Sequence, residues 1–219
     1  MVDMNEQMLH NNLAKYYDRV YSFRDYLDEA VRLQNLIIKY SESGGNSLLD
    51  VACGTGLHIK YLKDDFSCTG VDVSNVMLKI ARKNVKGVTF KEADMKTLRL
   101  GKQFDVIVCL LSSIGYVKTA ARLEKTIQNF SKHLKKGGLA LIEPSHAKSA
   151  YVTGEPRITT YDGREVKIAR RRASPLQPQR GSPDAVRADQ ARHAVPDHGH
   201  EGTSDGRVLT RRGDVGFRS

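Results

Sequence analysis

The segment Leu48-Leu49-Asp50-Val51-Ala52-Cys53-Gly54-Thr55-Gly56 joins a short apolar run to a glycine turn. The apolar run predicts a buried strand over Ser47–Cys53, and the residues after the turn predict a helix over Leu57–Lys63. Gly54 and Gly56 therefore lie between a strand and the start of a helix. Glycine lets a ligand approach the backbone without a Cβ in the way, and the first helical turn presents free N–H groups there.

The alternation of apolar strand and amphipathic helix continues along the chain. Further apolar runs predict strands at Cys68–Val73, Val88–Glu92, Phe104–Leu111 and Leu139–Glu143. Helical spacing predicts helices over Leu13–Leu36 with a break near Ser22–Arg24, from the N-cap Ser74 to Asn84, and over Ala120–Leu134. Strands that are apolar throughout and separated by helices indicate an α/β fold with a doubly wound, mostly parallel, Rossmann-like sheet.

Two of these helices carry more detailed expectations. The helix after Ser74 is expected to bury one face, made of Val76, Met77, Ile80 and Ala81. The helix over Ala120–Leu134 is expected to end at Lys135-Lys136-Gly137-Gly138, where lysines would meet the negative end of the helix dipole and glycine would form the C-cap.

Acidic residues stand at three successive strand ends. Asp50 precedes the glycine turn, Asp72 ends the next strand, and Asp94 follows the third. A dinucleotide fingerprint needs a third glycine, but this chain has Ile59 there, and Asp50 would repel a pyrophosphate. The three carboxylates instead favour a ligand with a cationic group, a ribose and an exocyclic amine. S-adenosylmethionine has all three.

At this point the chain resembles the class I S-adenosylmethionine-dependent methyltransferases over residues 10–145. The motifs that carry the resemblance are Leu48–Gly56, Gly70–Ser74, Ala93–Met95, Phe104–Cys109 and Leu134–Leu139. A narrower resemblance, to the nucleotide-linked aminosugar N,N-dimethyltransferases, is carried by Val51–Gly56, Leu110–Tyr116 and Ile142–Pro144.

The resemblance implies the site. Asp50 would hold the methionine ammonium, Asp72 the ribose hydroxyls and Asp94 the adenine amine. The residues implied to bind the cofactor are Tyr17, Tyr21, Asp50, Ala52, Cys53, Gly54, Gly56, Asp72, Val73, Met77, Asp94, Met95 and Leu110. The catalytic candidates are Tyr21 and Tyr116, with Ser113 and Glu143 also at the rim. No metal site is expected, because His58 has no Cys or His partner at metal-ligand spacing.

The function implied is methyl transfer by in-line displacement to the amino group of a small molecule. Two alternatives stay open: an RNA or protein methyltransferase, and a catalytically defective cofactor-binding paralogue. Nucleic acid is not the expected partner, because the lysines are spread over several elements and Leu111-Ser112-Ser113-Ile114 stands where nucleic-acid N-methyltransferases often carry an N-P-P-Y tetrad. The oligomeric state, monomer or homodimer, is open.

Composition gives the cellular context. The 219 residues carry a net charge of +10, and the chain contains three cysteines, none in C-x-x-C spacing. An odd cysteine count argues against a disulfide framework or a zinc cluster, and neither a membrane-spanning run nor a secretory leader is visible. We expect a cytoplasmic protein.

The domain organisation divides at a compositional break. We expect a helical lid over residues 1–46, the cofactor-binding core over 47–144, a substrate-pocket hairpin within 145–170 and an atypical tail over 171–219. The hairpin would pair Ile158–Tyr161 with Val166–Ile168 around Asp162-Gly163. The tail has nine arginines but no lysine, asparagine or isoleucine, and it is too poor in aliphatic residues to supply the strands that close such a sheet.

Two explanations of the tail compete: a disordered basic extension, and out-of-frame translation from near Arg170, which we favour. If the frame has shifted, the coding DNA read in another frame after codon 170 encodes a helix and two apolar strands. Sequencing that DNA is the measurement. Early stop codons in both other frames, or no such pattern, would contradict the shift. A shifted frame would leave the sheet edge unclosed and the pocket without a wall, with reduced or absent turnover.

Overall fold

The computed structural model describes residues 13–144, 157–172 and 208–211. The chain divides into two compact units. Residues 13–144 and 208–211 belong to the larger unit, and residues 157–172 belong to the smaller one. The two units are described separately.

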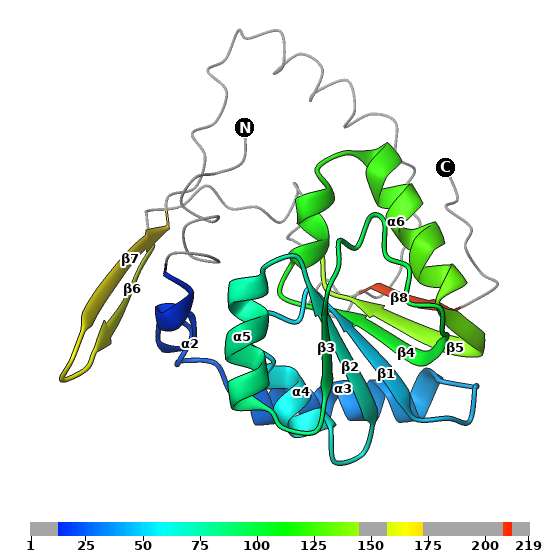
Figure 1. Ribbon diagram of the computed structural model, residues 1–219, viewed down its shortest axis with the longest axis horizontal. Coiled ribbons are helices and arrows are strands. Elements are labelled where there is room, and N and C mark those ends of the chain that lie inside the picture. The colour runs from blue at the N-terminus through cyan, green and yellow to red at the C-terminus, as the bar shows by residue number, and fades with distance from the viewer. Residues whose placement is uncertain (1–12, 145–156, 173–207, 212–219) are drawn as a thin grey trace, which may run out of the picture. The chain divides into compact units, whose positions relative to one another are not determined.

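A six-stranded sheet with the order β3-β2-β1-β4-β5-β8 forms the centre of the larger unit (Figure 1). Five strands run parallel: β1 (Ser47–Val51), β2 (Ser67–Asp72), β3 (Thr89–Glu92), β4 (Phe104–Cys109) and β5 (Leu134–Ile142). The first strand, β1, pairs with β2 on one side and with β4 on the other, so the order of the sheet reverses beside it. The doubly wound, mostly parallel sheet is confirmed.

Three of the helices described here start at a side chain that caps them. In chain order they are η1 (Ala14–Tyr16), α2 (Tyr17–Val20), α3 (Tyr26–Tyr40), α4 (Leu57–Leu62), α5 (Asn75–Asn84), η2 (Ser113–Val117) and α6 (Ala120–Lys132). The side chains of Asp25, Ser74 and Thr119 accept backbone N–H bonds at the starts of α3, α5 and α6. The predicted break in the N-terminal helix is confirmed, since α2 and α3 are separate.

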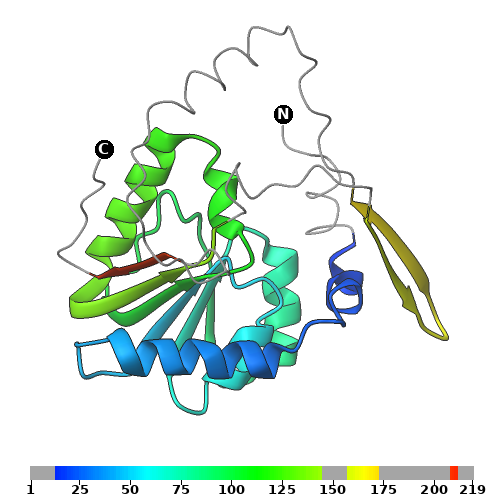
Figure 2. The ribbon, with the colours of Figure 1, turned by 180° about the vertical axis from the view of Figure 1, so that it is seen from behind.

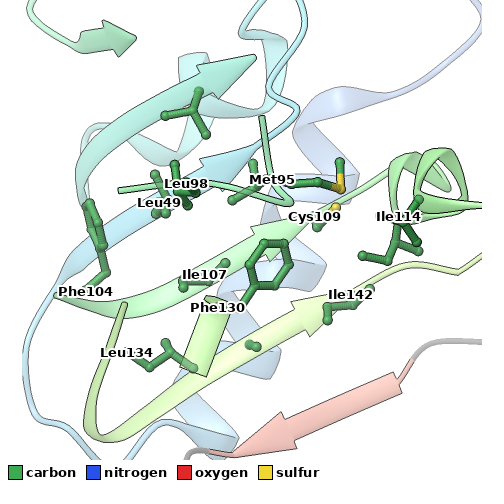
Figure 3. Packing of buried hydrophobic residues seen from close by; sticks show 14 residues of the cluster. Leu49, Met95, Leu98, Phe104, Ile107, Cys109, Ile114, Phe130, Leu134 and Ile142 are labelled. Carbon is green, nitrogen blue, oxygen red and sulfur yellow. The ribbon is translucent and has the colours of Figure 1, made fainter. Parts of the chain in front are cut away.

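Both faces of the sheet are buried. Alternate residues of one strand point to opposite faces, so Val106 and Val108 pack with Ile37 of α3, whereas Ile107 and Cys109 pack with Phe130 of α6. Figure 2 shows α3 lying across one face, and Figure 3 shows Phe130 among the side chains of the other face. This arrangement leaves the carboxyl ends of the strands as the edge at which a ligand can enter.

One local expectation is wrong, and another is confirmed only in part. Lys135–Gly138 do not cap α6, because that helix ends at Lys132 and these residues are already part of β5. The pairing of β4 with β5 shifts register between Phe104 and Val106, which accommodates Gly137 at a φ of 74° within the strand. In α5 the buried residues are Met77, Leu78 and Ala81, whereas Val76 is 40% exposed.

The β5 edge of the sheet carries a strand that the sequence did not predict. Val208–Arg211 forms β8 and pairs antiparallel with Leu139–Ile142. The expectation that closing strands are missing is therefore wrong for this one strand. Backbone pairing with the free N–H and C=O groups of β5 requires little of side-chain composition. The rest of the predicted tail, residues 173–207 and 212–219, lies outside the described residues.

The smaller unit contains the expected hairpin. Arg157–Asp162 (β6) pairs antiparallel with Lys167–Arg172 (β7), and Asp162 lies opposite Lys167. The connection is longer than a two-residue turn, since it runs over residues 163–166 and the Gly163 N–H donates to the Val166 carbonyl. The function of this hairpin as a pocket wall stays a prediction.

None of the helices in the described part of the chain combines the length and apolar character that a bilayer span needs. The cytoplasmic location stays a prediction.

Candidate functional site

A pocket opens at the carboxyl ends of β1 and β4, the adjacent central strands. Its lining comes from the turn after β1, from the start of α4, from the loop after β4 and from the N-terminal helices. The lining residues are Tyr17, Tyr26, Asp50, Ala52, Cys53, Gly54, Thr55, Leu57, His58, Leu110, Leu111 and Ser113. Ligands of open α/β sheets bind at this edge, where the strand order reverses.

Three alternate residues of the glycine turn have left-handed backbone. The φ angles are 63° at Ala52, 55° at Gly54 and 78° at Gly56. A Cβ on Gly56 would lie only 3.3 Å from both Ala81 and Phe90, and the φ of 78° also favours glycine there. A Cβ on Gly54 would have no atom within 4 Å, and the same residue lines the pocket. The space beside Gly54 is therefore left open to a ligand.

Asp72 fixes this turn to the next one. Its carboxylate accepts the Gly54 N–H and the Ser74 N–H, each at 2.8 Å, and the residue is 9% exposed. One buried side chain at the end of β2 thus determines where the turn after β1 and the start of α5 lie.

Asp50 is a buried acid that faces the pocket. The residue is 2% exposed and lines the pocket. Burial raises its pKa to about 7; the nearby His58 opposes this rise, and the charge of Asp72 adds to it. A buried ionised carboxylate is costly, and a cationic group of a ligand would compensate it. This donor set fits the ammonium of S-adenosylmethionine.

The N-terminal helical segment is fastened to the glycine turn. The Asp18 carboxylate accepts the Thr55 hydroxyl at 2.6 Å and the Asn84 side-chain amide at 3.2 Å. The same Asn84 amide donates to the Thr55 carbonyl at 3.0 Å. These bonds bring α2, the glycine turn and the end of α5 together, which places Tyr17 at the pocket.

Tyrosine phenols close this side of the pocket. The rings of Tyr17 and Tyr21 have centroids 4.7 Å apart, and the Tyr26 ring meets the His58 ring edge-on at 5.0 Å. Burial raises the pKa values of Tyr17 and Tyr26 far above the usual range. Both phenols are therefore protonated at physiological pH and can donate hydrogen bonds, but they cannot serve as bases.

The structure brings together only part of the predicted site. Tyr17, Asp50, Ala52, Cys53, Gly54, Leu110 and Ser113 line the pocket. The other predicted residues are not part of this lining. Tyr21 packs on Tyr17, Gly56 and Met77 are buried, and Asp72 joins the turn after β1 to the start of α5. Val73 is 62% exposed, and Tyr116 is 43% exposed on η2. Their roles toward the cofactor stay predictions.

The third predicted acid has an ion-pair partner of its own. The Asp94 carboxylate accepts the Lys96 N–H at 2.9 Å and pairs with the Lys96 ammonium at 2.9 Å. The next residue, Met95, is 8% exposed and packs in the core beside Phe130 (Figure 3). The Asn129 amide donates to its carbonyl at 3.1 Å.

Sequence reasoning missed several lining residues. The Tyr26 side chain reaches the pocket from the first turn of α3, which apolar spacing does not reveal. His58 is a helix N-terminal residue, as predicted, but it is buried and bonds to Glu29 of α3 at 2.8 Å. No sequence spacing indicates a partner 29 residues away. Leu111 could have been inferred from its place directly after the strand that ends at the pocket.

The comparisons with known proteins concern the residues of this site. A family described as a methyltransferase domain matches residues 48–138. The dTDP-3-amino-3,4,6-trideoxy-alpha-D-glucopyranose N,N-dimethyltransferase of Streptomyces venezuelae is 36% identical over 158 residues, which are 70% of this chain and 66% of that protein.

The chain is also similar in structure to solved methyltransferases. DesVI of Streptomyces venezuelae superposes with a TM-score of 0.66 at 33% identity, covering 71% of this chain and 67% of that one. An amino pentose methyltransferase from Micromonospora echinaspora, solved with S-adenosylmethionine bound, gives 0.63 at 28% identity, covering 69% and 65%. The chain spans 52% to 66% of the length of the curated aminosugar relatives it matches.

The buried carboxyl of Asp50 predicts how stability depends on pH. Its folded pKa of about 7 lies above the unfolded value, so the native state holds the extra proton and stability falls as pH rises from about 4 to 7. Asp50→Asn should remove this loss and unfold with a free energy higher by about 4 kcal/mol at pH 8. Urea unfolding at pH 8 and pH 4 measures it, with pH 4 as the internal control. Equal stability of the two proteins at pH 8 would contradict the burial of a charged Asp50.

Proposed function

The chain belongs to the S-adenosylmethionine-dependent methyltransferases, and from this membership we propose that it methylates the amino group of a nucleotide-linked amino sugar. The observation that carries the proposal is the buried Asp50 carboxyl in a pocket at the carboxyl ends of β1 and β4. A site built this way favours a cationic ligand. The curated relatives named as dTDP-aminosugar N,N-dimethyltransferases support the acceptor class.

Residues of the pocket and acids at the neighbouring strand ends would share the binding of the cofactor. We assign Asp50 to the ammonium, the open backbone at Gly54 to the methionine portion and Asp72 to the ribose hydroxyls. Asp94 is assigned to the adenine amine, and its ion pair with Lys96 holds its carboxylate at this edge of the sheet. When bound, S-adenosylmethionine supplies a methyl group activated by its sulfonium.

Methyl transfer to an amine depends more on the placement of the acceptor amine than on a strong acid or base. An amine attacks as its neutral form, and correct placement alone can contribute roughly 7–11 kcal/mol to lowering such a barrier. The Tyr17 phenol stays protonated and lies in the pocket lining, where it would exclude water from one side. We assign contact with the acceptor to Tyr116 on η2, which is 43% exposed and follows the pocket loop after β4.

An RNA acceptor is the second candidate, and one groove favours it. The groove lies between residues 96–103 and α6, away from the Asp50 pocket, and it is lined by Lys96, Arg99, Lys102, Lys125 and Lys132 with no acidic residue among its lining. Five cations would suit phosphates. No Phe, Tyr or Trp lines the groove for base stacking, so we favour the small-molecule acceptor.

The transfer assay tests the proposal directly. The full chain is incubated with S-adenosylmethionine and dTDP-linked 3-amino and 4-amino sugars, and added methyl groups are read by mass spectrometry. We expect one or two methyl groups on the amine, and Tyr116→Ala should lower kcat/KM for the acceptor about tenfold without weakening cofactor binding. Cofactor binding with methylation of RNA but of no amino sugar would favour the second candidate.

The Asp50 pKa predicts how cofactor affinity depends on pH. A pKa of about 7 means that the carboxylate is mostly protonated at pH 5.5, which removes the charge that pairs with the ammonium. The Kd for S-adenosylhomocysteine should rise on the order of tenfold from pH 7.5 to 5.5. Titration calorimetry measures the change. Asp50→Asn should bind weakly at both pH values, and an equally steep pH dependence in that variant would assign it to another group.

A further inference from the structure

The loop after β4 adopts an unfavourable backbone conformation where it forms a wall of the pocket. Leu111 and Ser112 have φ angles of 53° and 61°, which place two consecutive non-glycine residues in the left-handed region. Leu110, Leu111 and Ser113 line the pocket. Such a conformation persists only where the surroundings hold it, and it recurs at functional sites.

The residues directly after β5 hold this loop. The Glu143 carboxylate accepts the Leu111 N–H at 2.9 Å, and the Glu143 N–H donates to the Cys109 carbonyl at 2.9 Å. The Ser112 hydroxyl donates to the Pro144 carbonyl at 3.3 Å. Of these three bonds, only the one to the Leu111 N–H is made by the Glu143 side chain. It holds the chain at the first left-handed residue.

We propose that Glu143 is a positioning residue for methyl transfer, which sets the pocket wall of Leu110, Leu111 and Ser113 by holding the Leu111 N–H. The inference rests on the proposed function, and it gives a role to Glu143, which the sequence placed only at the rim of the site. An amide oxygen can accept the same bond, so this role does not need an ionised carboxylate. Misplacement of a reacting partner by about 1 Å costs on the order of a hundredfold in rate.

Three variants of the full chain test the inference. Glu143→Ala removes the acceptor and should lower kcat on the order of a hundredfold, with the cofactor Kd changed less than about threefold. Glu143→Gln keeps an acceptor oxygen and should retain kcat and its pH profile within about threefold. Adding Ser112→Gly to Glu143→Ala should recover about tenfold, because glycine adopts the left-handed region without a Cβ clash. Glu124→Ala, an exposed site on α6, is the matched control.

Two results would overturn the inference. If Glu143→Gln is as defective as Glu143→Ala, the residue acts through its charge or as a base. If Glu143→Ala turns over at the rate of the unaltered chain, the bond to Leu111 has no part in catalysis.

Hydrogen exchange at the Leu111 amide separates this inference from the proposed function. The unaltered chain and Glu143→Gln should protect the amide, and Glu143→Ala should exchange it at least about tenfold faster. If the unaltered chain methylates no amine, the proposed function fails while this readout still decides whether Glu143 holds the wall. Equal exchange in all three proteins would overturn the positioning role whatever the turnover.

Discussion

The site depends on two hydrogen bonds that the Asp72 carboxylate accepts from the backbone. By accepting the N–H groups of Gly54 and Ser74 at 2.8 Å each, one side chain joins the turn after β1 to the start of α5. In this turn Ala52 is left-handed at a φ of 63°, which is unfavourable for a non-glycine residue. Gly54 and Gly56 can adopt many backbone conformations, so an external restraint is needed to keep one. That restraint fixes the open backbone at Gly54 beside the buried Asp50 carboxyl.

The other wall of the pocket is restrained in the same way. The turn after β1 is held by a carboxylate from the end of β2, and the loop after β4 is held by the carboxylate of Glu143, just after β5. In each case the acid comes from the neighbouring strand on the outer side of the sheet. Strained backbone on two adjacent strand ends, each held by a neighbouring acid, leaves a pocket whose walls are set before any ligand binds.

The Asp50 carboxyl shows that stability and binding oppose one another here. Burial raises its pKa to about 7, so the pocket carries a group that lowers stability once it ionises. The same group gives a cationic ligand a strong partner in a place with little water. The N-terminal segment, fastened through Asp18 to Thr55 and Asn84, covers this place with tyrosine rings.

The sequence by itself determined the order of strands and helices, the glycine turn and the acids at three strand ends, because apolar periodicity and glycine placement are local properties. It wrongly predicted that Lys135–Gly138 end a helix, whereas pairing with β4 makes these residues part of a strand. It also did not predict that Val208–Arg211 forms a strand, which pairs with the free edge of β5. Only the tertiary structure decided that Asp18 meets Thr55, that Glu29 meets His58 and that Glu143 meets Leu111. These partners are 37, 29 and 32 residues apart, and only the packing of whole elements brings such residues within hydrogen-bonding distance.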